Sequence, residues 1–260
     1  MRLQTNKHVF LTAGLFAIVL ATTSCRSHYA LKGIERTVIV VDSRYDAQPD
    51  ERAVAFLAPY KQQVDSIMGP VVGEVAHDMS ARRPESDLSN LLADILVWAS
   101  KDYGEQPVLG LYNMGGIRAA LSKGKVTRGD VLDVAPFENR ICFLTLTGAK
   151  LLELFTQIAS VGGEGVSHGV ELVITPQRQL VSARLHGKEI DPESSYRVVT
   201  INYLLEGNDK MMALRSGTDI VAPEESSNNT RFIIMNYFQD KTARGEVVRS
   251  QVEGRITIKQ

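Results

Sequence analysis

Residues 141–160, ICFLTLTGAKLLELFTQIAS, join an expected strand to an expected helix without a break. The β-branched and aromatic residues of ICFLTLT are typical of a strand. Beyond Thr147, apolar side chains recur every three or four residues, as at Leu151, Leu154 and Ile158. That spacing predicts an amphipathic helix, and Thr147 is well placed to be its N-cap.

Similar patterns extend in both directions from this stretch. Helical spacing runs from Glu51 to a stop at Gly69-Pro70, and it returns over residues 88–99 and 231–241. Strands are expected at 37–41, 71–76, 108–112, 170–175, 180–187, 196–205 and 254–259, whereas 126–137 alternates briefly and turns at Pro136. Helices and strands follow no strict strand–helix–strand rhythm, which favours an α+β fold with mixed sheets. No linker follows residue 35, so residues 36–260 are predicted to form one domain.

The first 25 residues have the composition of a bacterial lipoprotein signal peptide. A short basic start precedes the run VFLTAGLFAIVLA, and TTSC closes the segment. Small residues before Cys25 resemble a lipobox, although Leu20 lies further upstream than usual. Lipidation of Cys25, a tether over residues 26–35 and a location in the cell envelope facing the periplasm are therefore expected. A plain signal peptide is the alternative, and the run of 13 is short for a membrane anchor, which needs about 20 residues.

Composition narrows the possible partners. The formal net charge of −1 gives no reason to expect nucleic acid as a partner.

The second cysteine, Cys142, lies in the expected strand 141–147 and is predicted to be a buried apolar residue. With Cys25 acylated, no disulfide within the chain is expected.

Sequence signatures of hydrolytic chemistry are missing. The five histidines are scattered singly, and there is no H-E-x-x-H, paired-cysteine spacing, G-x-S-x-G or P-loop. His168 lies in the glycine-rich GGEGVSHGV and is interpreted as an ordinary loop residue. No metal site is predicted in this chain.

Polar clusters at the ends of apolar elements indicate binding instead. They are RRPESDLSNLLAD (82–94), LYNMGGIR (111–118), VAPFEN (134–139) and TINYLLEGNDK (200–210). Loops on a rigid scaffold commonly carry binding residues. These clusters are the candidate functional segments.

Five ordered strings resemble the C-terminal domain of 5'-nucleotidases. They are ESDLSNLLAD, YNMGGIRAAL, GDVLDVAPFEN, LTGAKLLELF and YRVVTINYLLEGNDK, and the resemblance covers about residues 50–215. It implies mixed sheets and helices in a layered α/β/β/α arrangement. It also implies that the domain binds a nucleotide or nucleoside.

The resemblance implies a role for six residues. The rings of Phe137 and Tyr203 would stack on the base, and the amide of Asn113 would face the base. Arg118 and Arg82 would face phosphate, and the acid Asp209 would accept hydrogen bonds from ribose hydroxyls.

Each of these assignments has an alternative. Asn113 could cap a turn, Arg118 could pair with Asp130, and Tyr203 could be a core residue. Arg83, the next residue in the chain, is the alternative to Arg82 as the second arginine that faces phosphate.

Three positions also depart from the family strings. Met114 replaces a glycine, so that backbone position is not expected to need a positive φ. Asp87 replaces an asparagine, and Lys210 replaces a glycine near the expected ribose contact. These departures leave base and sugar preference open.

In the family, a separate N-terminal metallophosphatase domain supplies two metals. The signatures of that domain are missing here, so the two divalent metals are expected only in a partner. Three functions stay open: the nucleotide-binding half of a split 5'-nucleotidase, a stand-alone nucleotide-binding lipoprotein, or a relic without ligand.

Overall fold

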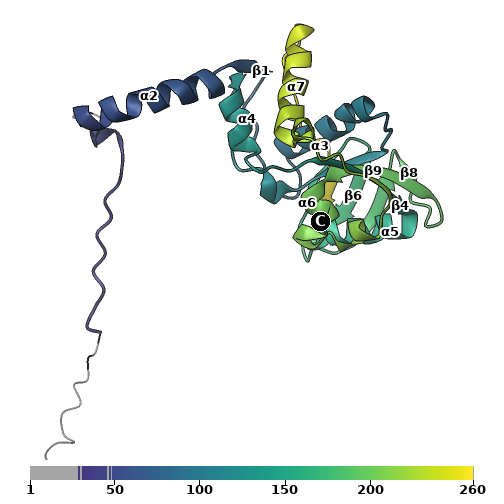
Figure 1. Cartoon of the computed structure of the whole chain (residues 1–260). Helices are drawn as coiled ribbons and strands as arrows, with labels where there is room; N and C mark the ends of the chain where they lie inside the picture. Colours follow the sequence, from purple (N-terminus) through teal and green to yellow (C-terminus); the bar gives the residue numbers. More distant parts are fainter. Residues whose placement is uncertain (1–28, 30, 46, 48, 260) are drawn as a thin grey trace, which may run out of the picture. The chain divides into compact units, whose positions relative to one another are not determined.

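The computed structural model describes residues 29, 31–45, 47 and 49–259 (Figure 1). They divide into two units, one up to Val54 and one from Ala55 onwards. In the first unit, residues 31–41 are exposed and belong to no helix or strand, so the predicted strand at 37–41 is wrong. A β-branched run forms a strand only where a partner strand pairs with it, and no described strand does so here. The predicted signal peptide and Cys25 lie outside the described residues.

The helices and strands have the following bounds. The α-helices are α2 (Glu51–Met68), α3 (Asp87–Ala99), α4 (Arg128–Val134), α5 (Gly148–Ser160), α6 (Asn202–Leu205) and α7 (Thr230–Ala243). The 3-10 helices are η1 (Ser43–Tyr45), η2 (Ser100–Tyr103), η3 (Met114–Gly116), η4 (Asn208–Lys210), η5 (Met212–Ser216) and η6 (Ser226–Asn228). The strands are β1 (Val71–Val75), β2 (Leu109–Tyr112), β3 (Gly124–Thr127), β4 (Ile141–Thr147), β5 (Gly165–Val166), β6 (Val170–Ile174), β7 (Leu180–Leu185), β8 (Lys188–Glu189), β9 (Ser195–Ile201), β10 (Thr218–Val221) and β11 (Ile256–Ile258).

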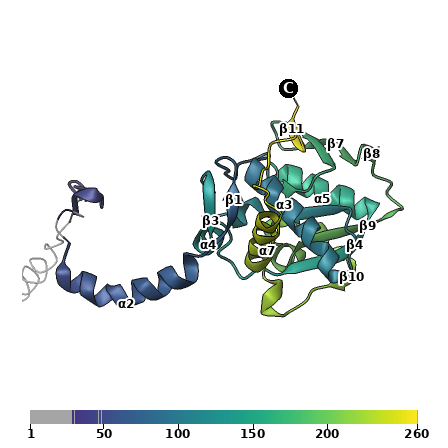
Figure 2. The same ribbon diagram turned by 90° about the horizontal axis from the view of Figure 1, so that it is seen from above.

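The second unit contains mixed sheets (Figure 2). A five-stranded sheet has the order β10-β4-β9-β2-β5, in which β2 is parallel to β9 and the other pairs are antiparallel. A four-stranded sheet has the order β11-β6-β7-β8, in which β11 is parallel to β6. β1 and β3 form a separate antiparallel pair. The predicted α+β class with mixed sheets is confirmed.

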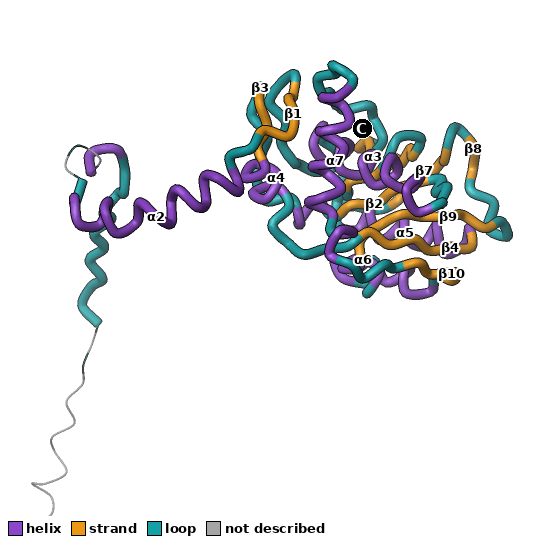
Figure 3. The backbone as a smooth tube through the Cα atoms, turned by 45° about the horizontal axis from the view of Figure 1, so that its top comes forward, coloured by secondary structure: helices purple, strands orange, loops and turns teal. Residues whose placement is uncertain are grey.

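Helices cover these sheets and close the core (Figure 3). α3 packs on β2 and β5, α7 packs on α3 and β1, and α5 lies against β4 and β7. Tyr112, Phe143, Phe155 and Phe238 are among the largest fully buried side chains. Cys142 is buried as expected, and burial raises the pKa of its thiol to about 12.

Local signals explain where several helices begin. The Thr147 side chain accepts a hydrogen bond from the Lys150 amide, so the predicted N-cap of α5 is confirmed. The sequence pattern predicts no helix in residues 126–137, whereas α4 occupies most of that stretch. Thr127 and Asp130 form a capping box at its start, a signal that the brief alternation of apolar residues obscured.

Among the described residues, no helix has both the length and the apolar character needed to cross a membrane.

Gly148, the first residue of α5, fills a position with no room for a side chain. A Cβ there would overlap the backbone carbonyl of Asp191 and approach Pro192. We expect Gly148→Ala to lower the free energy of unfolding by about 1–3 kcal/mol in urea denaturation. Gly129→Ala in α4 is the matched control, because its Cβ would meet neighbours only at ordinary contact distances of 3.5 Å. Equal stability of both variants would contradict the packing argument.

Candidate nucleotide-binding site

A cavity of about 360 Å³ lies where three chain segments meet. The segments are the turn after β2, the loop after α4 and the stretch from α6 to η4. Its lining residues are Asn113, Gly115, Gly116, Arg118, Phe137, Asn139, Tyr203 and Asp209. The fold thus brings together five of the six residues predicted from sequence, although they are spread over almost 100 positions.

Asp209 links two other polar residues of the cavity, Asn113 and Tyr203. Its Oδ2 accepts a hydrogen bond from Asn113 Nδ2 at 3.0 Å, and its Oδ1 accepts one from the Tyr203 hydroxyl at 3.0 Å. The bond to Asp209 raises the pKa of Tyr203. Tyr203 is 36% exposed, so the alternative that it is a core aromatic is excluded.

The side-chain carbonyl oxygen of Asn113, Oδ1, is buried and has no hydrogen-bond partner within the described residues. Asn113 makes no side-chain cap to η3, which excludes the turn-cap alternative. A Cβ at Gly116 would overlap this amide, so only glycine allows the backbone to pass so close to it. A buried acceptor without a partner is energetically costly, and a ligand N–H group that reached it would remove that cost.

Met114 precedes the two glycines without needing a left-handed backbone. It is not among the described non-glycine residues with positive φ, so the expectation for this position is confirmed. Asp209 and Lys210 do have positive φ, at 52° and 68°. Lys210 therefore adopts a conformation that glycine would adopt with less strain.

Phe137 and Tyr203 present partly exposed rings to the same cavity. Arg118 lies beside the first ring, with its Cζ 5.9 Å from the ring centroid of Phe137. Asp130 does not pair with Arg118, because its carboxylate is engaged with Thr127 in the capping box. The guanidinium of Arg118 therefore lies at the cavity without an ion-pair partner among the described side chains.

A buried carboxylate, Glu164, holds the backbone behind the cavity. It accepts hydrogen bonds from the Met114 amide and from Arg83 Nη2, the latter at 2.7 Å. Burial raises the pKa of Glu164 to about 7, against the opposing effects of those two donors. Arg83 is thus engaged in an ion pair. Arg82 is exposed and does not line the cavity, so its predicted contact with phosphate stays a prediction.

Helix α7 anchors the loop that carries Phe137. Arg231 Nη2 donates to the Pro136 carbonyl at 2.9 Å, and the Thr230 amide donates to the Asn139 carbonyl at 2.8 Å. Sequence reasoning missed Asn139, although the amide two residues after Phe137 was visible in VAPFEN. It also missed Glu164 and Arg231, whose contacts join segments far apart in the chain.

The described residues include no group of three or more His, Cys, Asp or Glu side chains that could hold a metal ion. The side chains of the described part of the chain therefore do not fit a site for two divalent metals.

Comparison with known proteins identifies the domain. The family model described as 5'-nucleotidase, C-terminal domain, matches residues 71–216. The chain belongs to this family. The match contains every residue that lines the cavity, whereas α7 and its Arg231 lie beyond it.

Three members of the 5'-nucleotidase C-terminal domain family are much longer than the part that matches this chain. The trifunctional nucleotide phosphoesterase protein YfkN of Bacillus subtilis is 25% identical over 251 residues, which are 86% of this chain and 16% of that protein. Protein UshA of Yersinia enterocolitica is 25% identical over 222 residues, or 81% of this chain and 38% of that protein. The crystal structure of a 5'-nucleotidase precursor from Thermus thermophilus matches with a TM-score of 0.68 and 27% identity, over 82% of this chain and 44% of the other. This chain thus spans less than half the length of each.

Proposed function

We propose that this protein is the nucleotide-binding half of a split 5'-nucleotidase. A separately encoded metallophosphatase would supply the two divalent metals and complete phosphate ester hydrolysis in nucleotide catabolism. The observation that carries the proposal is the cavity in which Asn113, Arg118, Phe137, Tyr203 and Asp209 meet.

The chemistry of the cavity suits a nucleoside 5'-phosphate. Two partly exposed rings can stack on a base, and base–aromatic stacking contributes about 1–3 kcal/mol per base. The free oxygen of Asn113 can accept from a base N–H, and Asp209 is an acceptor for ribose hydroxyls. The Arg118 guanidinium offers a planar set of donors for phosphate oxygens.

The proposal also includes attachment of the domain to a membrane. We infer that Cys25 is lipidated and holds the domain at a bacterial membrane, facing the periplasm. The basic start, the apolar run and the small residues before Cys25 support this inference. Metabolic labelling with a palmitate analogue should mark the wild-type protein and not Cys25→Ser.

The direct test combines complex formation with activity. The protein is co-purified with metallophosphatases encoded in the same genome, and phosphate release from AMP and UMP is measured. We expect a complex whose activity exceeds that of either chain alone. No complex and no gain in activity would overturn the proposal, and nucleotide binding by the isolated chain would then favour a stand-alone binding lipoprotein.

Arg118 should distinguish phosphate recognition from base recognition. We expect Arg118→Gln to weaken AMP binding about 10- to 150-fold and to leave adenosine binding nearly unchanged, because a charged hydrogen bond contributes about 1.5–3 kcal/mol. Calorimetric titration with both ligands measures the difference. Arg128→Gln, an arginine outside the cavity, is the control, and equal weakening for AMP and adenosine would contradict the assignment of Arg118 to phosphate.

A further inference from the structure

Helix α2 exposes an apolar face that the described residues do not cover. None of its residues is buried. Leu57, Tyr60, Val64 and Ile67 recur at spacings of three and four, so they share one face, and each is 49–59% exposed. At 18 residues the helix is about 27 Å long, which makes this a long apolar stripe.

Such a helix has little stability of its own. Most helical stability in proteins comes from packing of an apolar face, and α2 also contains Pro59, which removes one helical hydrogen bond. A surface that covers the stripe would supply the missing packing energy. The stripe is therefore a candidate interface.

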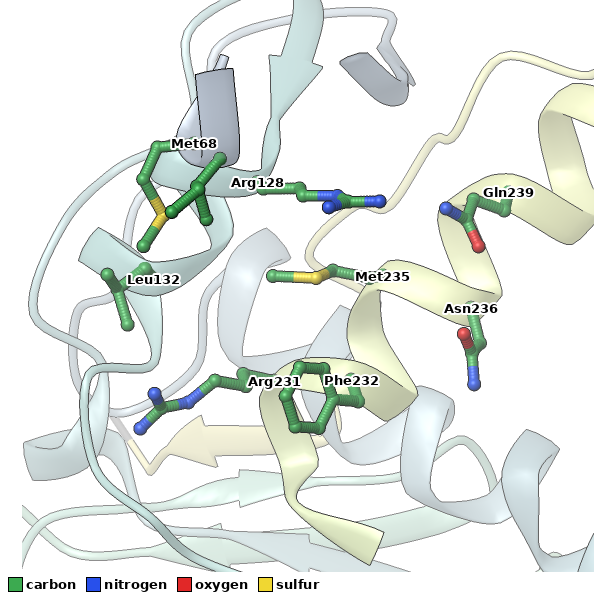
Figure 4. Close-up of a pocket in the computed structure, with 9 residues that line it drawn as sticks. Met68, Arg128, Leu132, Arg231, Phe232, Met235, Asn236 and Gln239 are labelled. Carbon is green, nitrogen blue, oxygen red and sulfur yellow. The ribbon is translucent and has the colours of Figure 1, made fainter. Parts of the chain in front are cut away.

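The stripe ends at a second cavity, of about 440 Å³ (Figure 4). Met68 and Leu132 lie on one side, and Phe232 and Met235 of α7 lie on the other. Phe232 is 43% exposed. Because Ile67 belongs both to the stripe and to the wall of this cavity, the two form one surface, which we call the docking face.

Positive charge borders the docking face. Arg128 and Arg231 line the cavity, and no aspartate or glutamate does. Neither guanidinium takes part in an ion pair with another described residue, and the Nε of Arg231 is buried without a hydrogen-bond partner. The complementary surface is therefore apolar at its centre, with carboxylates opposite the two arginines.

The place of α2 relative to the matched family region supports one occupant of this face. The matching family model describes a C-terminal domain, so the additional chain of a longer member precedes the residues that correspond to Val71. In the Thermus thermophilus protein more than half of the chain lies outside the matched region. α2 directly precedes Val71 and is therefore positioned where such a preceding domain would meet this one.

We propose that the docking face binds the metallophosphatase partner, which contributes an apolar patch with carboxylates at its edge. This inference rests on the proposed function and adds the contact surface to it. A second copy of this chain is a poorer occupant, because the arginines of one docking face would find no carboxylate in the other.

The test changes the charge of the docking face. Leu57→Glu/Val64→Glu and Arg128→Glu are each compared with Gln62→Glu, which adds a negative charge on the opposite side of α2. Each variant is co-expressed with the metallophosphatases of the same genome, and the affinity of the purified chains is measured by biolayer interferometry. We expect the double variant and Arg128→Glu to weaken the complex at least 10-fold and Gln62→Glu to change it less than 2-fold.

Nucleotide titration of each isolated variant shows whether the domain is intact, because all the substituted positions lie outside the nucleotide cavity. Wild-type affinity of the double variant for the partner would overturn the docking face and leave the split enzyme standing. No complex with the wild-type chain would overturn both. A dimer of this chain that the double variant abolishes, with no metallophosphatase bound, would overturn the inference in favour of a second copy.

Discussion

The double variant Phe137→Ala/Tyr203→Ala is expected to lower the affinity for AMP by about 30-fold to 10⁴-fold. Each ring should contribute about 1–3 kcal/mol if a base stacks between them, and the two together about 2–6 kcal/mol. The rings come from segments more than 60 residues apart, and both line the cavity. Because neither side chain is part of the buried core, the fold should survive the substitutions.

Single variants separate stacking from the polar network of the cavity. Tyr203→Phe keeps the ring and removes only the hydroxyl that donates to Asp209 at 3.0 Å, so it should cost much less affinity than Tyr203→Ala. Phe137→Ala also removes the ring beside Arg118, so part of its effect should depend on phosphate. Calorimetry with AMP and adenosine measures both differences.

Phe232→Ala is the control for the double variant. It removes an exposed ring of similar size that does not line the nucleotide cavity, and its AMP affinity should equal that of the wild type. If the double variant also bound AMP with wild-type affinity, the base would not stack on these rings. The proposal of a base clamp would then fail.

Local sequence signals predicted much of the fold. The stop at Gly69-Pro70 and the cap at Thr147 lie within a few residues of the helix ends that they determine, so reading them needs no tertiary information. The prediction of a strand at 37–41 was wrong, because a strand depends on a distant partner strand that its own residues do not encode.

The candidate site shows the same limit. Asn113, Arg118, Phe137, Tyr203 and Asp209 could be grouped in advance only because the order of their motifs resembles a family. Nothing in the spacing of residues 113 and 209 predicts the bond between Asn113 and Asp209. Glu164 was missed because an acid between two glycines gives no sign of being buried.

Glu164 should make the stability of the domain depend on pH. Its side chain is fully buried, and burial raises its pKa to about 7 from the ordinary value of 4.5. The folded protein therefore holds a proton that the unfolded chain has released between these two values. The stabilisation from this group is fully present below about pH 4.5 and is lost as the pH rises through about 7. It amounts to about 3 kcal/mol.

Glu164→Gln removes this titration and should flatten the pH profile. A glutamine cannot ionise, so the free energy of unfolding of the wild type should fall by about 3 kcal/mol relative to the variant between pH 4.5 and pH 8. Urea denaturation at half-unit pH steps measures the difference. Glu171→Gln, which replaces an exposed carboxylate on β6, should keep the wild-type profile.

The two profiles also test why this carboxyl is buried behind the cavity. Glutamine retains an oxygen for the Met114 amide, but it cannot form the ion pair with Arg83. At pH 8, where wild-type Glu164 is ionised, the wild type has lost the pH-dependent stabilisation relative to the variant, so it should hold the turn of Asn113 less firmly and bind AMP less tightly. Near pH 5, where both side chains are neutral, that difference should disappear. Parallel unfolding profiles of wild type and Glu164→Gln would mean that Glu164 is already ionised at pH 5, and the Arg83 pair would then outweigh its burial.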